Sequence, residues 1–136
     1  MLADVNNDGR ADIIGFGNDA VYVSLSTGTG FSLPERWLYS YGYDASAGGW
    51  CVDKHQRMMA DVNNDGMADI VGFGEDAVYV ALSQGTTFGF AERWLYSYGY
   101  GVGGWRVDKH PRMMVDVDND GMADIVGFGN DAVYVS

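Results

Sequence analysis

The sequence has one cysteine, two prolines and only eight lysine and arginine residues among its 136 amino acids. A single cysteine, Cys51, excludes an internal disulfide. No run of about twenty apolar residues is present, so no segment is predicted to span a membrane. The few basic residues form no stripe that could neutralise phosphates, so nucleic acid is not an expected partner.

Acidic and apolar residues dominate instead. Hydrophobic residues make up 47% and aromatic residues 14% of the chain, which excludes a disordered acidic tail despite the net charge of −11. Ten of the nineteen acidic residues fall in three short segments, which is typical of cation sites. These ten are Asp4, Asp8, Asp12, Asp61, Asp65, Asp69, Asp116, Asp118, Asp120 and Asp124.

The chain is one unit repeated. Ala3–Ser24 (ADVNNDGRADIIGFGNDAVYVS) returns with few changes as Ala60–Ala81 and again as Val115–Ser136. Between these copies, two further stretches recur, ERWLYSYGY at Glu35–Tyr43 and Glu92–Tyr100, and GGW-x-VDKH-x-RMM at Gly48–Met59 and Gly103–Met114. A fixed period of this kind indicates a repeat architecture.

Within one unit the pattern predicts strands and no helix. Alternating β-branched and aromatic residues, separated by glycine-rich turns, predict four short strands per roughly 56 residues, as in a propeller blade. The expected strands of one unit are Val52–Val62, Asp69–Gly74, Ala77–Ser83 and Glu92–Tyr98. Alternation also predicts that Trp37, Tyr39, Tyr41 and Tyr43 share one face.

We therefore predict an all-β fold of β-propeller blades, each with four antiparallel strands. The expected boundaries are a first blade at about 1–43, a second at about 48–100 and a partial third at about 103–136. Such an arc exposes an apolar face at each end, and repeat units cannot bury their faces alone. We expect homo-oligomerisation to close a ring of about six or seven blades. Because the chain starts almost on a repeat element, we also expect a trimmed or engineered array.

The three acidic segments predict calcium sites. Oxygen side chains at positions 1, 3, 5 and 9 can converge on one cation, glycine at position 6 permits a sharp turn, and the carbonyl at position 7 adds a ligand. The EF-hand glutamate at position 12 is absent, so we expect a calcium-binding hairpin with a structural role. The alternative is a metal-free turn rich in Asp and Asn. The candidate ligands are Asp4, Asn6, Asp8, Arg10 and Asp12; Asp61, Asn63, Asp65, Met67 and Asp69; and Asp116, Asp118, Asp120, Met122 and Asp124.

These loops, followed by ADIVGFG and AVYVS, resemble the FG-GAP/VCBS repeats of integrin-type propellers. The longer unit, with RWLYSYG, GGW and H-x-R-MM, is similar to the Psathyrella velutina lectin family. This resemblance covers the whole chain. It implies a seven-bladed propeller with calcium in such loops, and glycan pockets between neighbouring blades for terminal N-acetylglucosamine and for sialylated glycans. The chain is too short to form seven blades by itself.

The same unit supplies residues suited to a sugar site, which needs an aromatic face and a few polar groups. The candidates are Trp37, Tyr39, Tyr41, Trp50, His55 and Arg57, which recur as Trp94, Tyr96, Tyr98, Trp105, His110 and Arg112. His55 and Arg57 are expected on one strand face. In the alternative interpretation, the aromatic residues form core between blades, and Asp53 pairs with Arg57 across blades.

The sequence thus favours a calcium-stabilised lectin. The alternative is an integrin-like structural or adhesion module that binds a protein partner. An enzyme is not expected, because no repeated Ser-His-Asp arrangement is present and the paired acids lie in the calcium loops. No signal peptide precedes the first motif, although calcium and glycan binding would suit an extracellular protein.

Overall fold

A computed structural model of the protein describes all 136 residues and contains three antiparallel sheets. The first sheet comprises β1 (Leu2–Ala3), β2 (Asp12–Phe16), β3 (Val21–Ser24) and β4 (Glu35–Leu38). The second comprises β5 (Arg57–Ala60), β6 (Asp69–Phe73), β7 (Val78–Ala81) and β8 (Glu92–Leu95). The third comprises β9 (Arg112–Val115), β10 (Asp124–Phe128) and β11 (Val133–Val135). The prediction of blades with four antiparallel strands is confirmed, with three strands in the last sheet.

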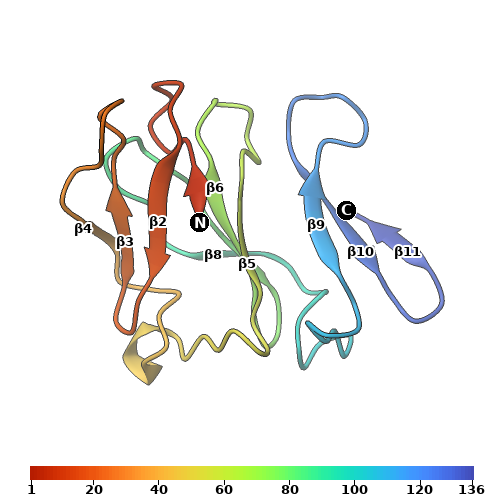
Figure 1. The fold of residues 1–136 in the computed structure, drawn as a ribbon. Coiled ribbons are helices and arrows are strands. Elements are labelled where there is room, and N and C mark those ends of the chain that lie inside the picture. Colours follow the sequence, from red (N-terminus) through yellow and green to blue (C-terminus); the bar gives the residue numbers. More distant parts are fainter.

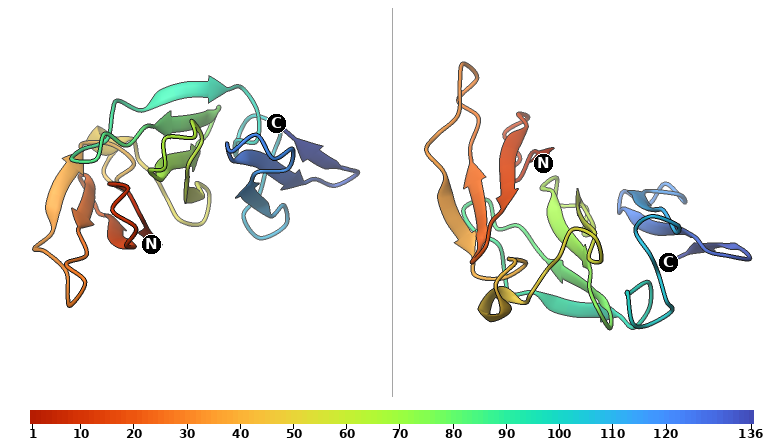
Figure 2. Two further views of the ribbon diagram at one scale, coloured as in Figure 1. Left: turned by 90° about the horizontal axis from the view of Figure 1, so that it is seen from above. Right: turned by 60° about the horizontal axis from the view of Figure 1, so that its bottom comes forward.

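The sheets lie side by side in chain order (Figure 1) and fan out along an arc when seen from above (Figure 2). Strands β4 and β8 lie on the outer side of this arc, whereas β5 and β9 contact each other across neighbouring sheets. The one helical segment is a 3₁₀ turn, η1 (Ala45–Ala47). No helix has the length and apolar character that crossing a membrane would require.

The strands of each sheet follow one another as hairpins. The turn between β2 and β3 is closed by a hydrogen bond from the Gly17 amide to the Ala20 carbonyl at 2.9 Å. The second and third sheets close the corresponding turns with bonds of the same length. The register shifts between Val78 and Tyr79 in the second sheet, and between Val21 and Tyr22 in the first. In both sheets one residue of the outer strand, Trp37 or Trp94, has no partner in the register, an irregularity of the β-bulge type.

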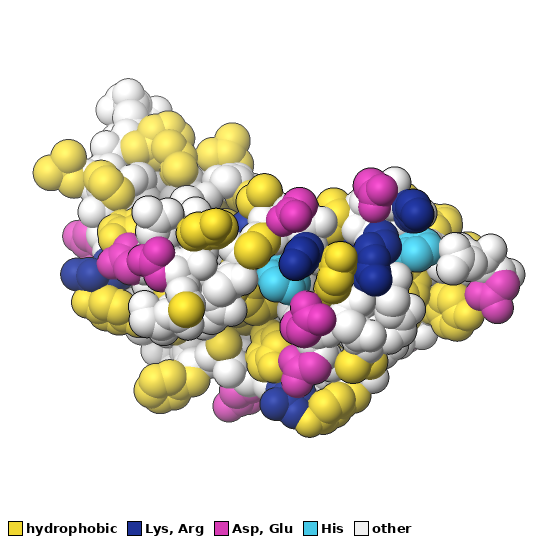
Figure 3. Space-filling view, turned by 90° about the horizontal axis from the view of Figure 1, so that it is seen from below, with side chains coloured by type: hydrophobic (Ala, Val, Ile, Leu, Met, Phe, Trp, Pro, Cys, Tyr) yellow, Lys and Arg dark blue, Asp and Glu magenta, His cyan; other side chains and the backbone are white.

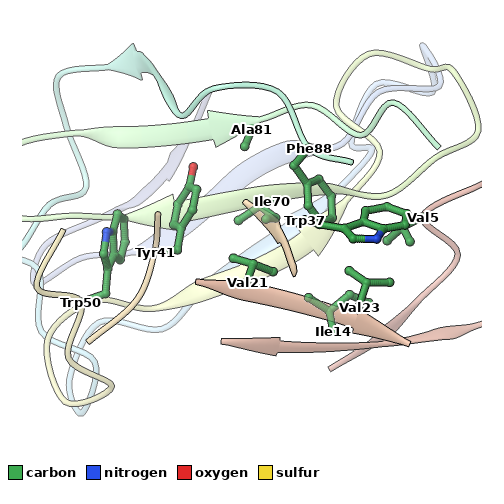
Figure 4. Packing of buried hydrophobic residues seen from close by; sticks show 10 residues of the cluster. All are labelled: Val5, Ile14, Val21, Val23, Trp37, Tyr41, Trp50, Ile70, Ala81 and Phe88. Carbon is green, nitrogen blue, oxygen red and sulfur yellow. The ribbon is translucent and has the colours of Figure 1, made fainter. Parts of the chain in front are cut away.

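The hydrophobic core lies between sheets. Ile14, Val21 and Val23 of the first sheet pack with Ile70 and Ala81 of the second (Figure 4). A second cluster joins the second sheet to the third in the same way. Fully burying one aliphatic side chain of this size contributes about 1.5–3 kcal/mol, so each blade is stabilised mainly by its neighbour.

Gly72 in β6 packs against two aromatic side chains of the preceding unit. A Cβ on Gly72 would lie 2.6 Å from both Trp50 and Tyr41, and Gly127 has the same relationship to Trp105 and Tyr98. Only a residue without a side chain leaves room for both rings at this distance from the strand. The repeated GFG motif therefore fixes the spacing between neighbouring blades.

The predicted alternation of the aromatic segment is wrong. Strand β4 ends at Leu38, Tyr41 has a φ of 55°, and the chain turns there. As a result, Trp37 and Tyr41 are buried, whereas Tyr39 and Tyr43 are exposed. The first strand of the unit is also shorter than predicted, because β5 begins at Arg57, and a turn at Val52–Lys54 precedes His55.

Candidate functional site

Two repeated features carry polar side chains in a defined geometry, the Asp loops and a pair of pockets between sheets. In the first Asp loop, the Asp4 carboxylate accepts hydrogen bonds from the amides of Asn6, Asp8 and Gly9, at 3.2, 3.2 and 2.8 Å. The other two loops wrap around Asp61 and Asp116 in the same way. Each loop is therefore folded around its own position-1 carboxylate.

The third Asp loop has the donor set of a metal site. One oxygen from each of Asp116, Asp118 and Asp120 lies within 4.8 Å of the other two, and all three residues are exposed. Three carboxylates this close repel one another unless a cation lies between them. Oxygen ligands of this kind suit hard cations such as Ca²⁺. The loop can therefore hold a metal ion.

The first loop differs in its countercharge. The Arg10 guanidinium lies 2.7 Å from the Asp8 carboxylate, whereas Met67 and Met122 occupy the equivalent positions in the other loops. An exposed pair of this kind contributes little stability. It nevertheless places one fixed positive charge beside the ligands of the first loop.

The position-9 aspartates connect each loop to its sheet. Asp69 is fully buried and accepts hydrogen bonds from the amides of Val62, at 3.1 Å, and Ser83, at 2.7 Å. Burial raises the pKa of the Asp69 carboxyl from 3.8 to about 6, and these two hydrogen bonds oppose the rise. Asp12 is equally buried and binds the equivalent amides of Val5 and Ser26.

Two equivalent pockets open between neighbouring sheets. The first pocket, about 340 Å³, lies between the first and second sheets, and the second pocket, about 490 Å³, lies between the second and third. Both volumes fall within the range of small-molecule sites. The first pocket is lined by Ser40, Gly48, Trp50, His55, Gly74, Glu75, Asp76, Tyr79 and Ala91. The second has Ser97, Gly103, Trp105, His110, Gly129, Asn130, Asp131 and Tyr134 at equivalent positions, together with Leu95, Tyr98, Val135 and Ser136.

Each pocket has one histidine, held in a fixed orientation, and both histidines reach the same face of the molecule (Figure 3). The Nδ1 atom of His110 accepts the Arg106 amide at 3.0 Å, and the ring packs edge-on against Trp105 at 5.6 Å between centroids. His55 repeats both contacts with Cys51 and Trp50, at 3.2 and 5.5 Å. Because Nδ1 is an acceptor, a neutral ring carries its proton on Nε2.

The opposite wall of each pocket comes from the next sheet. Tyr79 donates its hydroxyl hydrogen bond to Asp76 at 2.8 Å, and Tyr134 donates to Asp131 at 2.9 Å. Burial and the bond to Asp76 raise the pKa of Tyr79. From the sequence, Tyr79 was expected only within the strand Ala77–Ser83, and Asp76 had no expected role. The signal that could have found them is the repetition of D-A-V-Y after every GFG motif.

The structure brings only some of the predicted sugar-binding residues into these pockets. Trp50, His55, Tyr98, Trp105 and His110 line them. Arg57 and Arg112 do not, because they donate to the carbonyls of Tyr41 and Tyr98, each at 2.8 Å. Burial lowers the pKa of Arg112 to about 10.

The outer aromatic residues gather elsewhere. Trp37, Tyr39 and Trp94 border the largest concavity, about 610 Å³, on the outer side between β4 and β8. Trp37 is buried against Phe88, with ring centroids 5.4 Å apart, whereas Trp94 is 48% exposed. Tyr96 is exposed and stacks under the Arg93 guanidinium at 4.6 Å.

Comparisons with known proteins agree with this architecture. The family model described as an FG-GAP-like repeat matches residues 61–127. A solved lectin from Agrocybe aegerita, described as recognising non-reducing terminal N-acetylglucosamine, is 42% identical with a TM-score of 0.93. That match covers 99% of this chain and 34% of the lectin, so this chain spans about a third of that protein's length.

More distant structures share the fold alone. A TcdB2-TccC3 structure is 17% identical with a TM-score of 0.72, and covers 98% of this chain and 6% of its own. The Photorhabdus luminescens Tc holotoxin pore is 18% identical with a TM-score of 0.72, and covers 99% of this chain and 6% of its own. A search of curated protein sequences finds no match. The chain therefore contains an FG-GAP-like repeat at residues 61–127 and, with its blade-like sheets, matches part of a larger lectin chain over 99% of its length.

Proposed function

We propose that the protein is a lectin that binds the non-reducing terminal N-acetylglucosamine of glycans in the first and second pockets. The observation that carries this proposal is the duplication of one pocket, with a tryptophan and a histidine from one unit facing an Asp–Tyr pair from the next. The 42% identity to an N-acetylglucosamine lectin supports the choice of ligand. Duplicated binding sites also raise avidity for glycans that carry several terminal residues.

The lining residues offer the chemistry that a pyranose needs. The aromatic rings of Trp105 and Tyr134 provide apolar surface for the C–H face of the sugar. The exposed Asp131 carboxylate accepts hydrogen bonds from hydroxyls, and hydrogen bonds to a charged group are the stronger ones. Such a site binds a sugar without catalysing a reaction. The similarity to a lectin supports this binding role.

We propose further that the three Asp loops bind Ca²⁺, one ion per loop. The ligands would be the side chains at positions 1, 3, 5 and 9 and the carbonyl at position 7. These are Asp4, Asn6, Asp8, Asp12 and the Arg10 carbonyl; Asp61, Asn63, Asp65, Asp69 and the Met67 carbonyl; and Asp116, Asp118, Asp120, Asp124 and the Met122 carbonyl. The ion would offset part of the negative charge of its loop and hold β1 to β2, and the equivalent strands in the other sheets, and would not contact the sugar.

We also propose that chains associate through the two ends of the arc and close a ring of about six or seven blades. Apolar side chains are exposed at both ends, with Leu2 67% exposed on the first sheet and Val133 56% exposed on the third. Trp94 is half exposed, whereas its equivalent Trp37 is covered by the next sheet. A light-scattering mass of a single chain in calcium buffer would contradict this part of the proposal.

The sugar proposal is tested by calorimetric titration of N-acetylglucosamine into the wild type and two variants of the second pocket. His110→Ala and Asp131→Asn should each remove binding at one pocket and reduce the stoichiometry, while the first pocket still binds. Asp131 is exposed, so its variant keeps the fold even if His110→Ala does not. Tyr96→Ala, an exposed aromatic outside both pockets, is the control and should bind normally. Absence of binding by a calcium-loaded wild type would favour an adhesion module with a protein partner.

A further inference from the structure

The first and second pockets are not chemically equivalent, because one wall position differs in charge. This position is Glu75 in the first pocket and Asn130 in the second, and Asn18 occupies it in the first repeat. The residues around it are unchanged, since each is followed by the same Asp-Ala-Val-Tyr. The exchange therefore introduces one negative charge at a wall position whose following residues are repeated.

In each pocket, the contact with the histidine determines which side-chain atoms of Glu75 or Asn130 remain free to bind a ligand. His110 Nε2 and Asn130 Oδ1 are 2.9 Å apart, so the amide oxygen accepts the ring proton and the amide NH₂ is free to donate. In the first pocket, the His55 Nε2 lies 3.5 Å from a Glu75 carboxylate oxygen. A carboxylate offers acceptors alone. The second pocket thus has a neutral donor where the first has a charged acceptor.

The Glu75 charge has no permanent countercharge. Its only ion-pair partner is His55, which is charged only when it is protonated, and the Glu75 side chain is 64% exposed. The neighbouring Asp76 lies 3.7 Å from Arg93, so the available guanidinium is directed to the other carboxylate. In the second pocket Asp131 has no ion-pair partner, so the pockets differ in where the charge lies: the first has a carboxylate without a fixed cation beside its histidine, and the second has a neutral amide there.

We propose that the residue at this position sets the charge selectivity of each pocket. Glu75 makes the first pocket reject saccharides that carry a sulfate or carboxylate, whereas Asn130 allows the second pocket to accept them. This inference rests on the proposed sugar-binding function. Two like charges at about 6 Å in a partly solvated site interact by an amount that corresponds to roughly three- to tenfold in affinity.

The test compares N-acetylglucosamine with N-acetylglucosamine 6-sulfate, two probes that differ in one charged group. Indole N–H signals in NMR titrations report each pocket separately, because Trp50 lines the first and Trp105 the second. In the wild type, sulfation should weaken binding about three- to tenfold more in the first pocket than in the second. High salt should reduce this difference, since it screens exposed charges.

Reciprocal variants supply the matched controls. Glu75→Asn should abolish the extra penalty in the first pocket, and Asn130→Glu should create it in the second. Glu75→Gln, which keeps the side-chain length, should behave as Glu75→Asn does. Equal sulfation penalties in the two pockets, or penalties that do not follow the substitutions, would overturn the inference while leaving N-acetylglucosamine binding intact. Failure of both pockets to bind the neutral sugar would overturn the proposed function, and this inference with it.

Discussion

The backbone carbonyl oxygen of Asp4 accepts a hydrogen bond from the amide of Ala68 at 2.8 Å, which ties the first Asp loop to the second. The same bond joins Asp61 to Ala123 at 2.9 Å, between the second loop and the third. In both bonds the acceptor is the backbone carbonyl of the position-1 residue, whose side chain is a proposed metal ligand. Ordering one loop around an ion therefore also orders an acceptor for the next loop.

This chain of contacts predicts coupled calcium binding. Asp61→Asn should remove one calcium ion per chain and weaken binding at the neighbouring loops by about fivefold, a coupling at the low end of the usual range. Calorimetric calcium titration measures both effects. Asp53→Asn, an exposed acid outside the loops, is the control and should change neither. Unchanged affinity at the two remaining loops would show that the sites are independent.

The repeated GFG glycine gives a prediction with an internal control. Gly72→Ala should destabilise the fold by about 2–3 kcal/mol, because the added Cβ would lie 2.6 Å from Trp50 and Tyr41. Gly15→Ala occupies the same repeat position, but its nearest neighbour beyond the adjoining residues is 3.9 Å away. Urea unfolding should therefore separate the two variants. Equal stabilities would mean that blade spacing does not depend on this glycine.

The fold was largely predictable from the sequence because repetition and strand alternation are local signals. The hairpins around Gly72 and the Asp loops follow directly from such patterns. The path after Trp37 was not predictable in the same way. Tyr41 takes a positive φ because Arg57, from the next blade, binds its carbonyl and Gly72 makes room for its ring. Those are tertiary contacts, and they override the alternation.

Tyr41 and Tyr98 occupy equivalent positions in successive repeats, so their variants can be compared directly. The Tyr41 hydroxyl is buried without a hydrogen-bond partner, whereas the Tyr98 hydroxyl lies 3.3 Å from the Ser136 hydroxyl. Removing an unpaired buried polar group relieves its desolvation cost, so Tyr41→Phe should stabilise the protein by about 1 kcal/mol. Tyr98→Phe should be neutral or slightly destabilising. Thermal unfolding of both variants checks this, and a loss of stability in Tyr41→Phe would contradict it.

The buried Asp69 predicts an unusual pH dependence for the metal-free protein. Its pKa is about 6 when folded and 3.8 as the reference, so the folded state binds the proton more tightly than the unfolded state. Stability in EDTA should therefore fall as the pH rises from about 4 to about 6, by on the order of 2–3 kcal/mol. Calcium should reverse the trend, because it binds the ionised carboxylate.

Melting temperatures measured across this pH range, with EDTA and with calcium, test the prediction. Asp69→Asn is the control, since an amide does not titrate and should remove most of the slope in EDTA. A stability that rises steadily with pH in EDTA would contradict the role assigned to Asp69.

Only some residues of the candidate site could be identified from the sequence. Trp50 and His55 were found because their residue types suit sugars and recur. Asp76 and Tyr79 were missed because their contribution depends on which sheet faces which, and repetition alone does not reveal that tertiary arrangement. Arg57 shares a segment with His55, but its side chain donates to the Tyr41 carbonyl of the preceding blade, a tertiary contact that strand alternation does not reveal.

The most direct test is a crystal structure of the calcium-loaded protein soaked with N-acetylglucosamine. We expect the sugar in the pockets between sheets, with its ring against Trp105 or Tyr134 and within hydrogen-bonding distance of His110 or Asp131, and equivalently at Trp50 and His55. Sugar bound only in the outer concavity beside Trp37 and Trp94, or in no pocket at all, would contradict the proposed site.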